Sequence, residues 1–347
     1  MRPTSAAAQH RDQARAAAGA AALHQGVRRL TTAGPPAGGA ASRSQAHTSW
    51  RAVLLLAVFL LLAPPMFVFG PLAGLLLLSR PSTTREWVWL AGVAVWSVLW
   101  LQQTGGLGAQ FIRAGAALLC GTFLALTLWR PSHRFSRALT ATAAAGMALA
   151  VWMRHFGTGW DDVRQAVETE LTTYHRAIRS EWATAPESRA LLEQMSAMTD
   201  TVSTLYPALL ALAAIAGLRL AWAWYHRIAE HPVGSPPAPF PAFAFSDQLV
   251  WGWVAGLAGF LLPVPEPWRL AGANLLLVWA VLYATRGLAV FSAVAAKVPR
   301  LVMAALALVS LFLLPFVLGG LTLLGLADTW LDFRRRFTAP NTRGLNP

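Results

Sequence analysis

Residues 301–327 read LVMAALALVSLFLLPFVLGGLTLLGLA, a run of 27 residues without a single charge. An α-helix needs about 20 predominantly apolar residues to cross the roughly 30 Å of hydrocarbon in a bilayer. The run from Ala52 to Ser79 has the same character. Core helices of soluble proteins are rarely so long and so free of charge, so these segments are expected to lie in lipid.

The composition of the whole chain agrees with this expectation. Hydrophobic residues make up 56% of the 347 residues and charged residues 12%, against about a quarter charged in soluble domains. Apolar segments occur at about 52–79, 87–103, 108–129, 138–156, 202–226, 248–263, 269–297 and 301–327. We therefore predict an all-α fold: a polytopic transmembrane helix bundle of about 8 apolar segments with an extramembrane helical hairpin.

Composition also divides the chain into parts. Residues 1–50 form an Ala- and Arg-rich tail, expected to be disordered because it has little apolar surface to bury. The tail also resembles an organelle transit peptide. The near-total replacement of lysine by arginine instead favours an unstructured cytoplasmic extension in a GC-rich bacterium. The remaining parts are the first transmembrane helices (51–156), an acidic segment (157–201), the second transmembrane helices (202–337) and a C-terminal tail (338–347).

Prolines and loop charges bear on the topology. Pro64-Pro65 and Gly70-Pro71 interrupt the first apolar run, which predicts two helical pieces or one kinked helix. The loop 130–137 carries three arginines and no acid, so the positive-inside rule places it in the cytoplasm. The acidic segment then lies outside, and a multi-pass protein of the bacterial inner membrane is predicted. Arg334–Arg336 would end outside, against the rule, unless an earlier crossing is miscounted or 301–327 is broken at Pro315 and Gly319-Gly320.

The acidic segment has the pattern of two amphipathic helices. Its first part carries one apolar stripe at helical spacing, formed by Val163, Val167, Leu171, Tyr174, Ile178 and Trp182. Thr184 and Glu187 have the spacing of a capping box, which predicts that a second helix starts there. The two helices form either a hairpin that folds over the membrane exit or an arm that binds a partner.

No arrangement of residues indicates catalysis. The eight histidines show no metal-protease spacing, the chain has no phosphate-binding loop, and Cys120 is its one cysteine. We expect no enzyme activity, no catalytic residue, no metal and no cofactor. The net charge of +13 lies largely in the tail and in short loops, as membrane insertion predicts. The expected partners are the lipid bilayer and other membrane subunits, not nucleic acid.

Polar residues inside the apolar segments need a reason, because a charge deep in a span costs about 2.5–3.5 kcal/mol on insertion scales. Arg286 lies in the middle of such a segment, with Gly287 beside it, and Asp247 is a plausible partner. Asn274 is explained by a hydrogen bond between helices. At the far end of the chain, Asp328, Trp330, Asp332 and Arg334 form a polar motif, which is typical of a membrane-anchoring exit with Trp330 at the interface.

Three blocks of sequence carry a family resemblance. They are Phe245-Ser-Asp247-x-x-Val-Trp251, then Asn274 with Tyr283-x-x-Arg286-Gly287-Leu288, then Leu-Gly-x-x-Asp328-x-Trp-x-Asp332-Phe-Arg334. Together they resemble the YybS-like family of uncharacterised bacterial membrane proteins, a domain of unknown function. That family is similar to the substrate-binding S components of energy-coupling-factor transporters.

The resemblance implies a membrane subunit that holds a small ligand. Its ligand-binding candidates are Asp247, Asn274, Tyr283 and Arg286. The Ala-x-x-x-Ala face that S components offer to their coupling partner is missing, since Leu56 follows Ala52 at that spacing. The alternative function is a structural or assembly protein of the cell envelope that transports nothing.

Overall fold

The computed structural model describes residues 64–102, 106–129, 134–182, 188–295 and 298–333. Contacts divide the chain into two units, Met1–Val58 and Phe59–Pro347, and every described residue belongs to the second. Several predicted features lie outside the described residues: the tail at 1–50, the positions Ala52 and Leu56 of the missing Ala-x-x-x-Ala face, the Thr184–Glu187 pair and Arg334. Predictions for them are neither confirmed nor contradicted.

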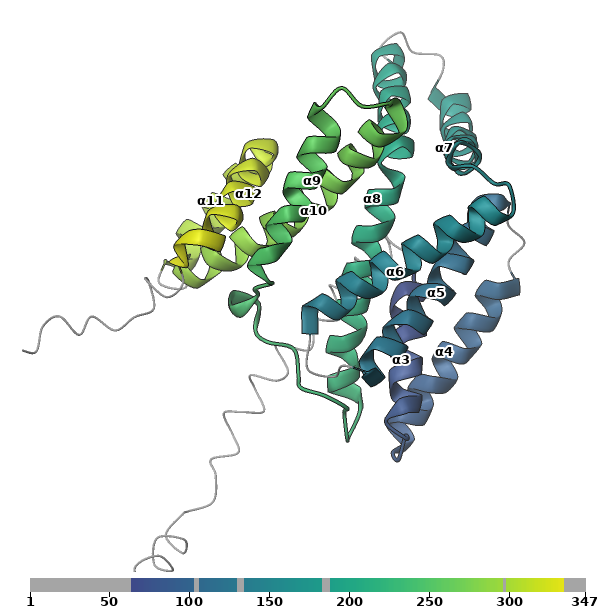
Figure 1. Ribbon diagram of the computed structural model, residues 1–347, viewed down its shortest axis with the longest axis vertical. Coiled ribbons are helices and arrows are strands. Elements are labelled where there is room, and N and C mark those ends of the chain that lie inside the picture. The colour runs from purple at the N-terminus through teal and green to yellow at the C-terminus, as the bar shows by residue number, and fades with distance from the viewer. Residues whose placement is uncertain (1–63, 103–105, 130–133, 183–187, 296–297, 334–347) are drawn as a thin grey trace, which may run out of the picture. The chain divides into compact units, whose positions relative to one another are not determined.

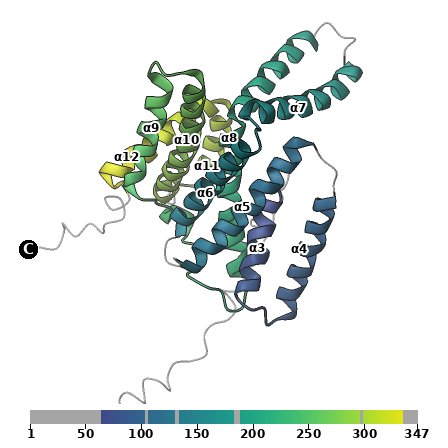
Figure 2. The ribbon, with the colours of Figure 1, turned by 45° about the vertical axis from the view of Figure 1, so that its right-hand side comes forward.

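The described residues are helical and contain no strand, which confirms the all-α prediction for this part of the chain (Figures 1 and 2). The α-helices are α3 (Met66–Leu78), α4 (Thr84–Gln102), α5 (Leu107–Trp129), α6 (Arg134–His155), α7 (Trp160–Trp182), α8 (Ser188–Ile228), α9 (Val250–Leu261), α10 (Glu266–Ala295), α11 (Arg300–Phe312) and α12 (Leu314–Leu331). Two 3₁₀ turns, η1 (Phe240–Ala242) and η2 (Asp247–Leu249), lie between α8 and α9.

Four helical stretches among the described residues are long and apolar enough to cross a membrane: Leu107–Trp129, Ser196–Ile228, Glu266–Ala295 and Leu314–Leu331. The predicted count of about eight apolar segments is therefore not confirmed. Two of the remaining apolar helices, α3 and α11, have only 13 residues each, which at 1.5 Å per residue is about 20 Å.

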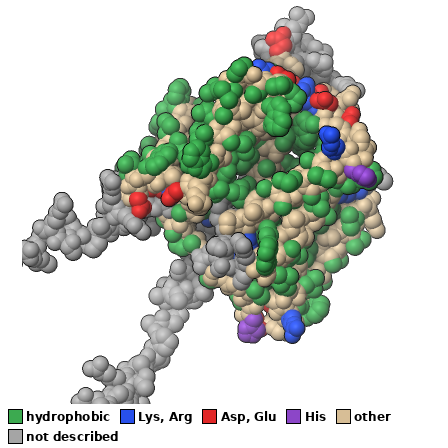
Figure 3. All heavy atoms as spheres, in the orientation of Figure 1, with side chains coloured by type: hydrophobic (Ala, Val, Ile, Leu, Met, Phe, Trp, Pro, Cys, Tyr) green, Lys and Arg blue, Asp and Glu red, His purple; other side chains and the backbone are tan. Residues whose placement is uncertain are grey.

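Large apolar side chains cover much of the visible face of the molecule (Figure 3). Leu301, Phe312 and Phe316 are 83%, 80% and 79% exposed. Water would penalise so much apolar surface, because monomeric soluble proteins rarely expose apolar patches larger than a few hundred Å². Lipid imposes no such penalty. The surface thus supports the membrane assignment independently of helix length.

Prolines in the first and the last apolar runs differ in whether they coincide with the end of a helix. Helix α3 begins immediately after Pro64-Pro65, whereas Pro71 lies inside it without ending it. In the last apolar run, α11 ends at Phe312 and Leu313 leaves the helical conformation at φ −103° and ψ 24°. Pro315 follows in the first turn of α12, where a missing N–H costs nothing. The run is therefore broken beside Pro315, and Gly319-Gly320 continue inside α12.

Helix α8 connects the two halves of the described bundle. It packs against α3, α6 and α7 and also against α10. Its 41 residues make about 60 Å of helix, so the second helix of the acidic segment and the following span are one element. The predicted boundary at residue 201 lies inside this helix. Because Ser203 donates a 3.0 Å hydrogen bond to Glu168, α7 is joined to α8.

The stripe predicted for the acidic segment begins inside the bundle. Val163 is buried with Phe111, Leu149 and Met153, and Val167 is buried one turn later. The side chains of residues 174–182, which include the last three positions of the stripe, lie outside the description. For its first two positions, the stripe therefore packs against the chain's own helices.

Candidate functional site

Arg286 uses its whole guanidinium group to hold three elements together. Its Nε donates to Oδ2 of Asp328 at 3.0 Å, and its Nη2 donates to the Asp328 carbonyl at 3.3 Å. Its Nη1 donates to Oδ1 of Asp247 at 3.1 Å and to the Phe245 carbonyl at 3.4 Å. We call Arg286, Asp328, Asp247 and Phe245 the arginine clasp. It links α10 and α12 to the segment that precedes α9.

The clasp combines a buried ion pair with an open one. Arg286 and Asp328 are only 5% and 4% exposed, whereas the Asp247 side chain is mostly exposed. Removing one partner of a buried pair leaves an uncompensated charge and typically costs 3–5 kcal/mol. The clasp is therefore a strong positional constraint on residues 245–247.

Glycines allow the two helices of the clasp to approach closely. A Cβ atom on Gly325 of α12 would lie 2.0 Å from the Tyr283 carbonyl oxygen of α10, and one on Gly287 would lie 2.0 Å from the Leu321 carbonyl oxygen. No other residue fits at either position without separating the helices. This contact brings Asp328 within reach of Arg286.

Tyr283 lies beside the clasp. Its side chain is fully buried, and its ring makes an edge contact with Phe245 at 5.2 Å between centroids. The Tyr283 hydroxyl lies near that of Thr329, but neither oxygen makes a hydrogen bond of normal geometry. The structure thus brings together three of the four predicted ligand-binding residues, Asp247, Tyr283 and Arg286.

Asn274 lies elsewhere. It precedes Arg286 by 12 residues on α10, about 18 Å along the helix. Its Oδ1 accepts a hydrogen bond from the Ala208 N–H of α8, and its Nδ2 donates to the Thr204 carbonyl, both at 3.0 Å. In a regular helix these two backbone groups bond to one another, and Pro207 lies between them, inside α8 without ending it. Nδ2 also donates to the Leu270 carbonyl of α10 itself at 2.9 Å. The two contacts that leave α10 therefore satisfy backbone groups of α8 on either side of Pro207.

The C-terminal motif is divided by the end of α12. Asp328 is buried in the clasp, whereas Trp330 is exposed, as expected at a lipid interface. The helix ends at Leu331, and Asp332 adopts a left-handed conformation at φ 43°.

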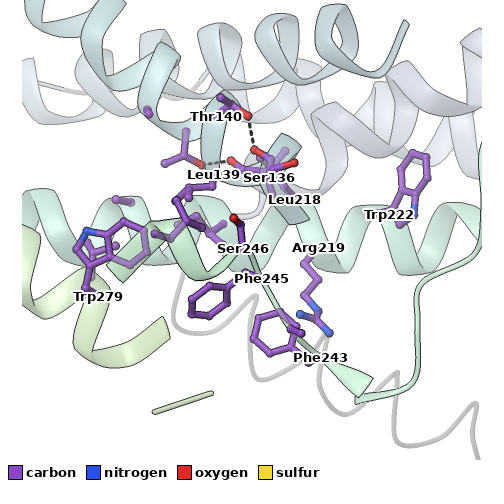
Figure 4. A pocket seen from close by; sticks show the side chains of 18 of the residues that line it. Ser136, Leu139, Thr140, Leu218, Arg219, Trp222, Phe243, Phe245, Ser246 and Trp279 are labelled. Atoms are coloured by element: carbon purple, nitrogen blue, oxygen red, sulfur yellow. Dashed lines mark hydrogen bonds between the residues drawn. The ribbon is translucent and has the colours of Figure 1, made fainter. Parts of the chain in front are cut away.

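A cavity of about 1000 Å³ opens between α6, α8, α10 and the segment 237–249 (Figure 4). In the view of Figure 4, Trp279 and Trp222 lie at opposite sides, with Phe245 and Ser246 between them. The lining is mostly apolar, with Arg219, Gln248 and a few hydroxyl groups as its polar members. Ligand pockets are typically 300–1000 Å³ and have this mixture of many apolar and few polar groups.

The clasp places one wall of this cavity without lining it. Phe245, Ser246 and Gln248 line the cavity, and they flank Asp247. The α10 side of the cavity is formed by Leu275, Val278 and Trp279, not by Asn274, Tyr283 or Arg286. None of the four predicted ligand-binding residues lines the cavity; Asp247 lies next to lining residues in the chain, and the other three lie on α10.

No ligand role is predicted from the sequence for two arginines that the structure places at or beside the cavity. Arg137 was counted among the charges of the 130–137 loop, but it lies in α6 and is 3% exposed. Arg219 lines the cavity and stacks over the Phe243 ring at 4.3 Å. Neither position has a local pattern that distinguishes it from an arginine reaching the membrane surface.

A third residue, Glu86, could have been found from its spacing. Thr83 and Glu86 form a capping box at the start of α4, in which the Thr83 N–H donates to Glu86. Glu86 also accepts a hydrogen bond from the Glu230 N–H, just beyond the end of α8. The backbone N–H groups of Thr83, Glu230 and Ser82 stabilise the carboxylate and lower the pKa of Glu86 from 4.5 to about 2.

No group of three or more histidine, cysteine or acidic side chains that could hold a metal ion occurs within the described ranges. Helices of this length and surface define an integral membrane protein. The chain belongs to the family described as predicted membrane protein (DUF2232), which matches residues 51–329. The expected membership of the YybS-like family is thus confirmed. Neither a curated protein nor a solved structure matches the chain, and the likeness to S components stays a prediction.

Proposed function

We propose that the protein is a small-ligand-binding subunit of the bacterial inner membrane, with its binding site in the cavity between α6, α8 and α10. The observation that carries the proposal is the cavity itself, about 1000 Å³ of space with a largely apolar lining. This size and this mixture of groups are typical of sites that bind small molecules. An S-component-like role, in which the protein captures a ligand for transport, fits such a site.

In this proposal the clasp is a positioning device. Arg286 donates to the Phe245 carbonyl and to Asp247, and it thereby fixes the wall on which Phe245 and Ser246 face the cavity. A guanidinium that already makes four hydrogen bonds has little capacity left for a ligand. Arg286 therefore acts on the ligand through Phe245, and Asn274 acts through the shape of α8.

The proposal includes no chemical step. The protein is multi-pass, catalyses nothing and uses no cofactor, and its partners are lipid and other membrane subunits. The competing assembly role rests on the later positions of the apolar stripe, Leu171, Tyr174 and Ile178, and predicts that their disruption is the harmful change. The first positions of the stripe, Val163 and Val167, pack inside the bundle.

A cavity-filling variant tests the proposal. Gly146 lines the cavity, and a Cβ atom there would meet no other atom within 4 Å, so Gly146→Leu places a side chain in the empty space. Gly121→Leu is the matched control, since Gly121 on α5 is equally open but does not line the cavity. The full chain, purified in detergent, is screened by thermal unfolding against vitamins, nucleobases and amphiphiles.

We expect at least one compound to raise the melting temperature of the wild type and of Gly121→Leu but not of Gly146→Leu. A ligand at 100 times its dissociation constant stabilises the folded state by about 2.7 kcal/mol, which such a measurement detects. If every compound that shifts the wild type shifts Gly146→Leu equally, the cavity is not the binding site.

A further inference from the structure

The cavity has a positive charge beside it that no carboxylate of the described residues neutralises. Arg137 is 3% exposed, and its Nε and Nη1 atoms make no hydrogen bond with any described group. Its guanidinium lies over the ring of Trp222 at 4.3 Å and near the ring of Phe123 at 5.9 Å. Both of these rings line the cavity, whereas Arg137 lies behind them and is not part of the lining.

A second cation lies in the same region. Arg219 lines the cavity, with its guanidinium 4.3 Å from the Phe243 ring (Figure 4). Arg219 and Trp222 are three residues apart on α8 and are therefore neighbours on the helix surface. The ring that Arg137 covers is thus adjacent to Arg219. In the described part of the chain, the ion pairs involve Arg164, Arg269 and Arg286 and neither of these two.

A buried cation without an anionic partner is unfavourable, because burial removes its hydration. Aromatic rings compensate for only part of that loss. Arg286, in contrast, makes four hydrogen bonds, two of them to carboxylates. Arg137 is buried and Arg219 is half-buried, and neither is in an ion pair with a described carboxylate. Guanidinium groups bind oxyanions with strong, often bidentate hydrogen bonds.

We propose that the cavity takes an anionic amphiphile, whose apolar body lies against α6, α8 and α10 and whose phosphate or carboxylate is held by Arg219, with the positive charge of Arg137 behind the Trp222 ring adding to the attraction. This inference rests on the proposed function and adds the chemical class of the ligand. The predicted orientation places this end of α6 at the cytoplasmic side. Anionic lipid headgroups and soluble phosphate esters are both available there, so the same chemistry has two sources.

The test uses the full chain in a neutral detergent and probes that share an apolar chain but differ in charge. Decyl phosphate, decan-1-ol and dioctanoyl phosphatidic acid are titrated, and dissociation constants are obtained from thermal unfolding. The variants are Arg137→Gln and Arg219→Gln. Arg269→Gln is the control, because Arg269 is exposed and pairs with Glu266 on the surface of α10.

We expect decyl phosphate to bind at least about ten-fold more tightly than decan-1-ol to the wild type and to Arg269→Gln. In Arg137→Gln and Arg219→Gln the ratio falls towards one. Without ligand, Arg137→Gln unfolds at or above the wild-type temperature, because the substitution removes a buried, uncompensated charge. This result also shows that the loss of selectivity does not come from misfolding.

The outcomes separate the two proposals. Equal binding of decan-1-ol and decyl phosphate overturns the anionic class but leaves the cavity as a ligand site. The anionic class is also overturned if none of the three probes binds the wild type. The cavity remains a ligand site in that case if other compounds still bind the wild type and not Gly146→Leu. If decyl phosphate binds selectively, its strength relative to dioctanoyl phosphatidic acid tells whether a soluble amphiphile or a lipid headgroup is the source.

Discussion

Replacing Asn274 is expected to destabilise the protein through α8 rather than through a ligand. Its side-chain amide binds the N–H of Ala208 and the carbonyl of Thr204, on either side of Pro207. Two hydrogen bonds between membrane helices, at about 0.6 kcal/mol each, give about 1.2 kcal/mol. A second estimate of the same loss is the cost of leaving a buried N–H or carbonyl without a partner, which is about 1–3 kcal/mol. Asn274→Leu should therefore lower the free energy of unfolding by about 1–3 kcal/mol.

A double-mutant cycle identifies the cause. In a Pro207→Ala background, α8 can close the bond between Ala208 and Thr204 by itself, so Asn274→Leu should cost less than about 0.5 kcal/mol. The coupling energy between the two positions is then at least about 0.5 kcal/mol. The assay is reversible unfolding of the purified protein in mixed micelles, followed by tryptophan fluorescence and far-UV circular dichroism.

The control is Thr285→Val on the same helix, because Thr285 donates only to the Leu282 carbonyl within α10. It should change the free energy of unfolding by less than about 0.5 kcal/mol. The reasoning fails if Asn274→Leu costs the same amount with and without Pro207. In that case Asn274 stabilises something other than the interrupted helix.

Three further predictions follow from other contacts. Arg286→Ala should destabilise the protein by about 3–5 kcal/mol by leaving Asp328 unpaired, and the Arg286→Met, Asp328→Leu double variant should recover most of this in the same unfolding assay. Gly325→Ala should cost about 1–3 kcal/mol because its Cβ meets the Tyr283 carbonyl, whereas Gly320→Ala, in open space on the same helix, should cost nothing. Glu86 has a folded pKa of about 2 against 4.5 otherwise, so the stability it contributes is full above pH 4.5 and is lost as pH falls towards 2. The difference in melting temperature between wild type and Glu86→Gln should shrink over that interval, and a constant difference would contradict this assignment.

Some of these contacts could be predicted from the sequence because they are forced by cost. A charge in the middle of an apolar helix must find a partner, and Asp247 was the candidate for Arg286, which the 3.1 Å ion pair confirms. An amide in the same helix must bond to a neighbour, and Asn274 does so. Both arguments need only the residue type and its depth in the segment. They say that a partner exists, and they identify it only when few candidates remain.

Which helix faces another could not be predicted, and the reason is physical. In water, an apolar stripe marks the buried face of a helix, as it did for Val163 and Val167. In lipid, the buried and the lipid-facing sides are both apolar, so the stripe disappears. Nothing in the residues near Arg286 indicates that Asp328, 42 residues later, lies against it. The contact of Arg137 with the Trp222 ring could not be predicted for the same reason.

Polar residues in apolar helices therefore need to be separated by what they contact before they are assigned to a ligand. Arg286 and Asn274 stand out in the sequence, but they are satisfied by carboxylates and backbone groups of this chain. Arg137 and Arg219 look ordinary in the sequence, but in the described structure each lies over an aromatic ring and neither is in an ion pair. A protein tolerates an uncompensated buried charge at a cost, and binding sites are where that cost is recovered when the ligand arrives. Unsatisfied groups beside a cavity consequently indicate the ligand more directly than satisfied groups inside a motif.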